Sequence, residues 1–147
     1  MKTIISKSVK ETQKLAKEIA KGFKGGDILA LVGDLGGGKT HFTKGIAKYF
    51  GINEDVQSPT FTLIHEYQCS KQIADNSKQV YRFYHMDMYR LKNEKEARNL
   101  GLSEIFEDEN GVSIIEWAEK IKNLLPKRTK FIEFGFVDKN TRRIIIK

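Results

Sequence analysis

A short glycine-rich run, GDLGGGKT at residues 33–40, has residue types and spacing that suit phosphate binding. Its Gly33, Gly38, Lys39 and Thr40 fit the pattern G-x-x-x-x-G-K-[ST]. In this pattern, backbone N–H groups surround the phosphates, the lysine ammonium faces the terminal phosphates, and the hydroxyl binds Mg²⁺. The run directly follows the apolar residues ILALV, so a buried strand would turn into a helix here. We therefore predict a nucleotide-binding loop.

Consecutive glycines at Gly36, Gly37 and Gly38 would let the backbone approach a phosphate without Cβ clashes. Glycine is costly to order, so a cluster of glycines indicates a backbone shape that other residues cannot take.

The guanine-reading motif N-K-x-D does not occur in the sequence, and ATP is therefore the expected nucleotide.

The magnesium ion of such a site needs a second anchor, usually a carboxylate at the end of another strand. Two acids fit this requirement. Glu116 ends the apolar run VSIIE, and Asp87 ends the more amphipathic run YRFYHMD. The more buried pattern favours Glu116 as the metal partner, and Asp87 would then hold a metal-bound water or orient the attacking water. For both acids a helix cap or a surface ion pair is the alternative.

Four further residues have two possible interpretations each. Thr60, in the turn QSPT, could be a switch residue near the γ-phosphate or part of a plain Ser-Pro turn. His85 could serve the site or the core, and Arg90 could neutralise phosphate charge or pair with an acid. Trp117 directly follows Glu116, and a tryptophan there is typical of a core or a partner surface.

Hydrophobic periodicity and turn residues divide the chain into alternating helices and strands. We expect helices at 8–23, 39–50, 92–100, within 102–110 and at 117–125, and strands at 28–32, 61–68, 79–87, 112–116, 131–137 and 142–147. Strands separated by helices predict an α/β fold, a parallel sheet with helices on its faces. Ligands bind at the carboxyl ends of such strands, where Gly33, Asp87 and Glu116 would converge.

The composition predicts one globular domain spanning residues 1–147. No apolar run approaches the roughly 20 residues of a membrane span, and the N-terminus lacks the apolar block of a signal peptide. A single cysteine, Cys69, fits the reducing cytoplasm.

The net charge of +7 could help to hold a nucleotide or an RNA. Solvated lysines on helix faces explain this charge better, because no Arg-rich run occurs.

Four motifs together resemble the TsaE family, once called YjeE. They are GDLGGGKTHFTKG, VQSPTFTLIHEY, YHMDMYRL and IIEWAEK, in this order, and the resemblance covers roughly residues 8–145. It implies a P-loop NTPase sandwich of three layers with a mixed, largely parallel central sheet. It also implies weak, Mg²⁺-dependent ATP hydrolysis in the synthesis of threonylcarbamoyladenosine in tRNA. TsaD and TsaB would be the partner proteins, and tRNA would be involved indirectly.

The resemblance also implies roles for individual residues. Asp87 matches an acid needed for activity, Thr40 and Glu116 match the Mg²⁺ ligands, and Thr60 lies in the switch-like segment. Ser8, Val9 and Arg142 fall where the family flanks the nucleotide base. The phosphate-binding residues would be Leu35, Gly36, Gly37, Gly38, Lys39 and Thr40. Two departures, Gly37 for the usual alanine and His41 after Thr40, remove no phosphate ligand.

Two other classes of function stay open at this point. One is a free-standing P-loop kinase of a small molecule, which needs a lid with several arginines. The middle of the chain offers only Arg82, Arg90 and Arg98 and little length for a lid. The other is a nucleotide-binding switch without significant hydrolysis. Phosphate release measured with and without partner proteins would separate the three classes.

Overall fold

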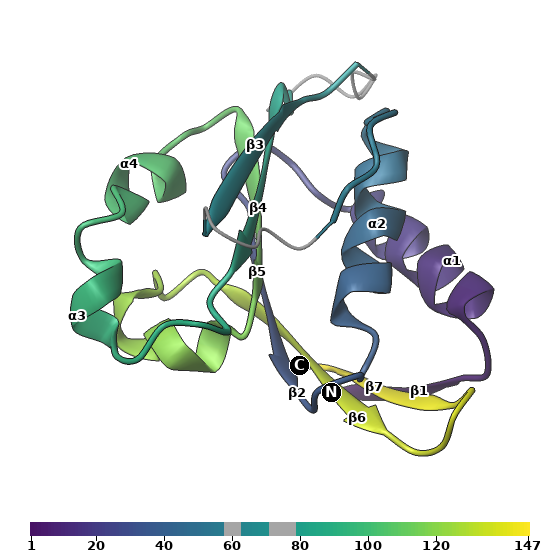
Figure 1. Cartoon of the computed structure of the whole chain (residues 1–147). Helices are drawn as coiled ribbons and strands as arrows, with labels where there is room; N and C mark the ends of the chain where they lie inside the picture. The colour runs from purple at the N-terminus through teal and green to yellow at the C-terminus, as the bar shows by residue number, and fades with distance from the viewer. Residues whose placement is uncertain (58–62, 71–78) are drawn as a thin grey trace.

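A seven-stranded sheet with helices on both faces forms the body of the protein (Figure 1). The computed structural model describes residues 1–57, 63–70 and 79–147. The strands lie in the order β1-β7-β6-β2-β5-β4-β3. The four central strands β6, β2, β5 and β4 are parallel, whereas β1, β7 and β3 pair antiparallel with their neighbours. The strands are β1 (Lys2–Ser6), β2 (Ile28–Gly33), β3 (Ile64–Gln68), β4 (Arg82–Asp87), β5 (Gly111–Glu116), β6 (Lys130–Phe136) and β7 (Arg142–Ile146).

The expected α/β fold with a mixed sheet is confirmed, and apolar strands hold its centre. All six residues of β5 and the first four of β2 are buried. Alternate residues of each strand point to opposite faces, so each face of the sheet has its own core. Helices α1 and α2 cover one face and α3, α4 and η1 the other (Figure 1). The helices are α1 (Val9–Ala20), α2 (Lys39–Tyr49), α3 (Glu94–Ala97), α4 (Leu102–Phe106) and the 3-10 helix η1 (Ala118–Leu124).

Helix α1 begins after its N-cap residue Ser8, and it supports α2. The Ser8 hydroxyl accepts from the Glu11 N–H at 3.0 Å, and the Glu11 carboxylate accepts from the Lys7 N–H at 2.6 Å. Helix α2 packs closely on α1 at Gly45, where a Cβ atom would lie only 2.7 Å from the Cβ of Ala16. The helix that follows the glycine loop therefore rests on a fixed partner.

Several elements differ from the sequence expectation. Strand β1 was not predicted, because its residues are mostly exposed and its pairing partner β7 lies at the other end of the chain. The helix expected at 92–100 is only α3, and the helix expected at 8–23 ends at Ala20. The helix expected at 117–125 is a 3-10 helix that kinks at Ile121. No helix in the described parts of the chain is long and apolar enough to cross a membrane.

Candidate functional site

Three strand ends meet at one edge of the sheet, as the sequence predicts. Gly33 ends β2, Glu116 ends β5 and Asp87 ends β4, and these strands are parallel neighbours. Asp87 lies opposite Glu116 in the register of β4 and β5. Because parallel strands share an orientation, their carboxyl ends gather side chains from distant segments in one place. The loop 33–40 starts from this same edge.

Positive φ angles shape the loop between β2 and α2. Gly33 has a φ of 115°, and a Cβ atom there would lie 2.1 Å from the carbonyl oxygen of Phe134. Gly38 has a φ of 98° and directly precedes α2. No side chain of the described residues caps this helix, so its first-turn N–H groups can serve an anion. Both glycines thus allow a sharp turn that ends in a helix N-terminus.

Lys39 folds back into this loop and is only 4% exposed. Its Nζ donates to the carbonyl oxygens of Gly33 at 2.9 Å and Asp34 at 2.6 Å. The ammonium also lies 4.2 Å from the centre of the Trp117 ring, a cation–π distance. Burial lowers the pKa of Lys39. The surrounding acids oppose this pKa shift, and they are Glu119, Glu116, Asp34 and Asp87.

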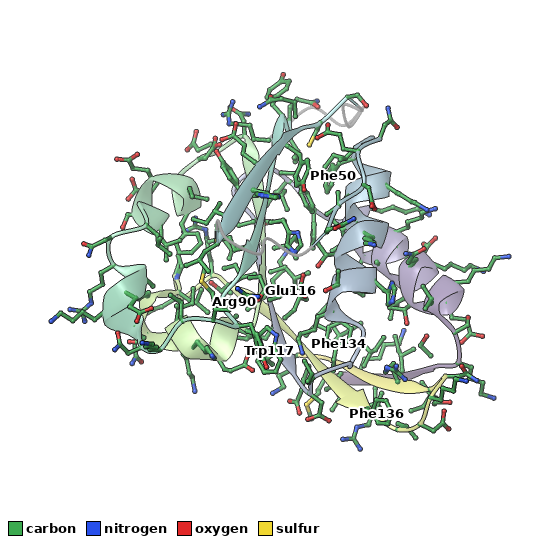
Figure 2. All side chains as sticks on the ribbon, viewed as in Figure 1. Phe50, Arg90, Glu116, Trp117, Phe134 and Phe136 are labelled. Carbon is green, nitrogen blue, oxygen red and sulfur yellow. The ribbon has the colours of Figure 1, made fainter. Side chains whose placement is uncertain are left out.

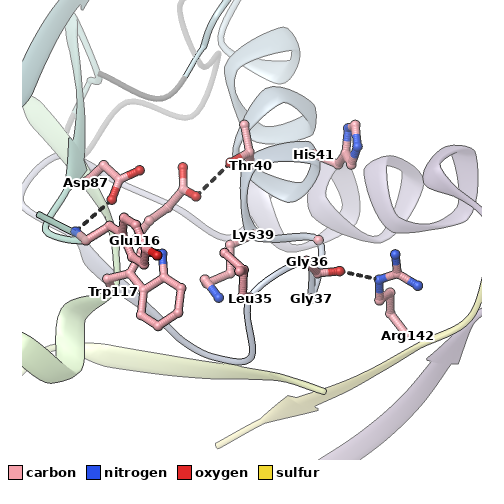
Figure 3. Close-up of a pocket in the computed structure, with 12 residues that line it drawn as sticks. Leu35, Gly36, Gly37, Lys39, Thr40, His41, Asp87, Glu116, Trp117 and Arg142 are labelled. Atoms are coloured by element: carbon pink, nitrogen blue, oxygen red, sulfur yellow. Dashed lines mark hydrogen bonds between the residues drawn. The ribbon is translucent and has the colours of Figure 1, made fainter. Parts of the chain in front are cut away.

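The buried carboxylate of Glu116 faces the first turn of α2 (Figure 3). The Thr40 hydroxyl donates to its Oε1 at 2.8 Å, and the His85 Nε2 lies 2.5 Å from its Oε2. Asp87 stands beside it and accepts the Tyr89 N–H at 2.9 Å. A carboxylate and a hydroxyl are oxygen ligands that Mg²⁺ prefers, and they fit a metal held jointly with phosphate oxygens and water. The described residues contain no cluster of three or more His, Cys, Asp or Glu that could hold a metal without such help.

A cavity of about 380 Å³ opens over the loop and the two acids (Figure 3). It therefore combines backbone N–H donors and a lysine with two carboxylates, the chemistry that a Mg²⁺-bound phosphate chain needs. Its lining includes every residue of the loop from Leu35 onward. The lining residues are Leu35, Gly36, Gly37, Gly38, Lys39, Thr40, His41, Asp87, Tyr89, Glu116, Trp117 and Arg142.

A second cavity of about 280 Å³ adjoins the first and contains Ser8 and Val9 in its lining. Gly38, His41 and Arg142 line both cavities. The Arg142 Nε donates to the Gly36 carbonyl oxygen at 2.7 Å, so β7 is tied to the glycine loop (Figure 3). The residues expected around the base therefore lie next to the phosphate-binding loop.

Comparison with known proteins identifies the family of this chain. Residues 6–145 match the family model described as threonylcarbamoyl adenosine biosynthesis protein TsaE. The chain belongs to the TsaE family. A TsaE protein of Bacillus subtilis is 47% identical over 117 residues, which are 80% of this chain and 66% of the relative. The Treponema pallidum TsaE protein is 32% identical over 97% of both chains. The crystal structure of Bacillus subtilis YdiB superimposes with a TM-score of 0.76 at 37% identity, covering 97% of this chain and 82% of that one.

Membership of the TsaE family favours the interpretation as a tRNA-modification protein over that as a free-standing kinase. Thr60 and the neighbouring Ser58 and Pro59 lie outside the described residues, so the proposed switch role of Thr60 stays a prediction. Arg90, labelled in Figure 2, is exposed and lines neither cavity. His85 is fully buried and contacts the site through Glu116.

Sequence reasoning missed three contributors to the first cavity of this TsaE chain. His41, Tyr89 and Trp117 line it, and the Tyr89 and Trp117 rings pack with centroids 5.0 Å apart. The left-handed backbone of Trp117, with a φ of 57°, turns its ring toward Lys39. Its position directly after Glu116 was a usable signal, because the residue after a strand-end ligand lies at the same edge of the sheet.

Proposed function

We propose that this chain is the ATP-binding and ATP-hydrolysing subunit of a cytoplasmic system that makes threonylcarbamoyladenosine in tRNA. The hydrogen bond between Thr40 and Glu116 below the glycine loop carries the proposal, because it joins the two expected Mg²⁺ ligands beside a phosphate-binding turn. The names of the relatives refer to this biosynthetic pathway. By resemblance, the chain would act with TsaD and TsaB, and tRNA would be served indirectly.

Phosphate binding would use the loop N–H groups and the ammonium of Lys39. The Lys39 Nζ would leave the carbonyl oxygens of Gly33 and Asp34 and donate to the β- and γ-phosphate oxygens instead. The glycine backbone at Gly36 to Gly38 lines the cavity and would contact the same phosphates. Leu35, at the exposed start of this segment, would contribute its backbone.

Thr40 and Glu116 would hold Mg²⁺. Held there, the ion would supply positive charge against the negative charge that develops on the γ-phosphoryl group. The Asp87 carboxylate, in register with Glu116, would orient the attacking water. This division of roles follows the burial of the two acids, since Glu116 is 2% exposed and Asp87 is only half-buried.

The nucleotide base would occupy the second cavity. Ser8 and Val9 line it from the start of α1, and Arg142 lines both this cavity and the phosphate cavity. The half-exposed Val9 side chain offers apolar surface to a planar base. Thr60 would complete the site as the switch residue that senses the γ-phosphate, as the family resemblance implies.

Phosphate release tests the proposal directly. The purified chain is mixed with ATP and Mg²⁺, alone and with TsaD and TsaB, and inorganic phosphate is measured over time. We expect slow release by the chain alone and faster release with the partners. Phosphate transferred to a small molecule would instead identify a kinase, and nucleotide binding without turnover in any mixture would identify a binding switch.

A further inference from the structure

His85 occupies an unusual place for a histidine, in the middle of the buried strand β4. Its side chain is fully buried, and its residue lies two positions before Asp87, on the same face of the sheet. This face carries Phe83 and Ile114 and is covered by α1 and α2. The Nε2 atom lies 2.5 Å from Oε2 of Glu116. A buried imidazole therefore touches the proposed metal carboxylate from below.

Of the two ring nitrogens of His85, only Nε2 has a hydrogen-bond partner among the described residues. Nδ1 is buried there and has no hydrogen-bond partner, so the contact with Glu116 is the only polar contact that the ring makes among these residues. An apolar side chain such as leucine would fill a similar volume without burying two ring nitrogens, which are costly to desolvate. A purely structural role in the core thus gives no reason for an imidazole at this position.

Glu116 makes two hydrogen bonds, and only one of the two donors is also an expected Mg²⁺ ligand. Thr40 donates to Oε1, but its hydroxyl oxygen is itself an expected Mg²⁺ ligand. The hydroxyl would then use a lone pair for the ion as well as its proton for the carboxylate. His85 has no such second duty and can donate to Oε2 throughout. A carboxylate can only accept, so Nε2 carries the shared proton.

We propose that His85 is a positioning residue for Mg²⁺. It holds the Glu116 carboxylate in one orientation, with Oε1 facing the Thr40 hydroxyl and Oε2 retained by Nε2. Hydrogen bonds from such outer partners fix the direction of a ligand and typically change metal affinity by about 10- to 100-fold. This inference rests on the proposed function, because it assumes that Glu116 binds the nucleotide-bound metal.

The test measures metal dependence of binding and needs no turnover. Isothermal titration gives the Kd of ADP with and without Mg²⁺ for wild type, His85→Leu, His85→Gln and His85→Asn. The glutamine amide can reach Oε2 as Nε2 does, whereas leucine has no donor and asparagine is too short. We expect the stimulation of binding by Mg²⁺ to fall by about 10-fold or more in the Leu and Asn variants and to stay within about threefold of wild type in the Gln variant. The Kd without metal should change by less than about threefold.

A double variant shows whether His85 acts through Glu116. In a Glu116→Gln background, adding His85→Leu should change the Mg²⁺ stimulation by less than about twofold, because the positioned carboxylate is already gone. The inference is overturned if His85→Leu and His85→Asn keep the wild-type stimulation. It is equally overturned if both Kd values worsen together along with the melting temperature, as for a core residue. A wild-type chain that binds no ADP would refute the proposed function itself.

Discussion

Replacing Lys39 with alanine removes the one ammonium that faces the phosphate cavity from the described part of its lining. In the structure this ammonium donates to the carbonyl oxygens of Gly33 and Asp34 and lies over the Trp117 ring. On binding, these contacts are exchanged for contacts with phosphate oxygens. The expected loss of affinity is therefore the energy of the ammonium beside phosphate minus its energy beside the two carbonyl oxygens and the Trp117 ring.

The size of that difference follows from the contacts. A unit charge about 4 Å from a phosphate charge contributes about 4 kcal/mol at the effective dielectric of a protein surface. Exchanging carbonyl for phosphate hydrogen bonds is close to neutral, but leaving the aromatic ring costs about 1–2 kcal/mol. The net contribution of Lys39 is then about 2–3 kcal/mol. This corresponds to a Kd for Mg²⁺–ATP that rises about 30- to 150-fold in Lys39→Ala.

Calorimetric titration with a slowly hydrolysed ATP analogue and Mg²⁺ measures this change. Lys44→Ala is the matched control, since Lys44 lies on the same helix but faces Asp55 at 3.8 Å and lines neither proposed nucleotide cavity. We expect the control to bind within about twofold of wild type. An unchanged Kd in Lys39→Ala, at a wild-type melting temperature, would contradict the proposed role of the loop.

Three further substitutions test the metal site, the helix packing and a charge network. Glu116→Gln should lower Mg²⁺-dependent turnover about 100-fold or more and metal-free nucleotide affinity by less than about threefold; unchanged turnover would move the metal role to Asp87. Gly45→Val should lower the free energy of unfolding by about 1–3 kcal/mol in urea titrations, because its Cβ would lie 2.7 Å from that of Ala16; wild-type stability would refute tight packing there. Hydrogen bonds from Arg82 hold the pKa of Asp108 in the folded protein below its usual range. The ionised Asp108 therefore stabilises the fold above about pH 4, and this stabilisation is lost as the pH falls through the lowered pKa. Asp108→Asn should therefore melt below wild type at pH 7 and approach it near pH 2, and a difference independent of pH would contradict this assignment.

The sequence was sufficient for the central sheet and for the loop because both depend on local patterns. The run ILALV is apolar at every position, short and followed by glycine, as expected of a strand that is buried on both faces. The spacing from Gly33 to Thr40 then identifies the turn and the helix that follows. The convergence of Asp87 and Glu116 needed one further rule, that the ends of parallel strands share an edge.

Other features depend on contacts between distant segments, and no local pattern encodes them. Strand β1 pairs with the edge of β7, and α3 spans only Glu94–Ala97 after its N-cap Asn93. The contact between His85 and Glu116 joins residues 31 positions apart. The sequence left His85 undecided between core and site, and the structure shows it to be buried and in contact with the site at once.

Trp117 is the single tryptophan of the chain, and its ring lies under the ammonium of the phosphate-binding lysine. Indole emission responds to nearby charge, and a nucleotide that draws Lys39 away would change the surroundings of this ring and of no other indole. The protein therefore contains its own optical reporter of occupancy. Stopped-flow fluorescence could follow the arrival and departure of nucleotide in real time, without a label and in the presence of any partner that lacks tryptophan near the cavity.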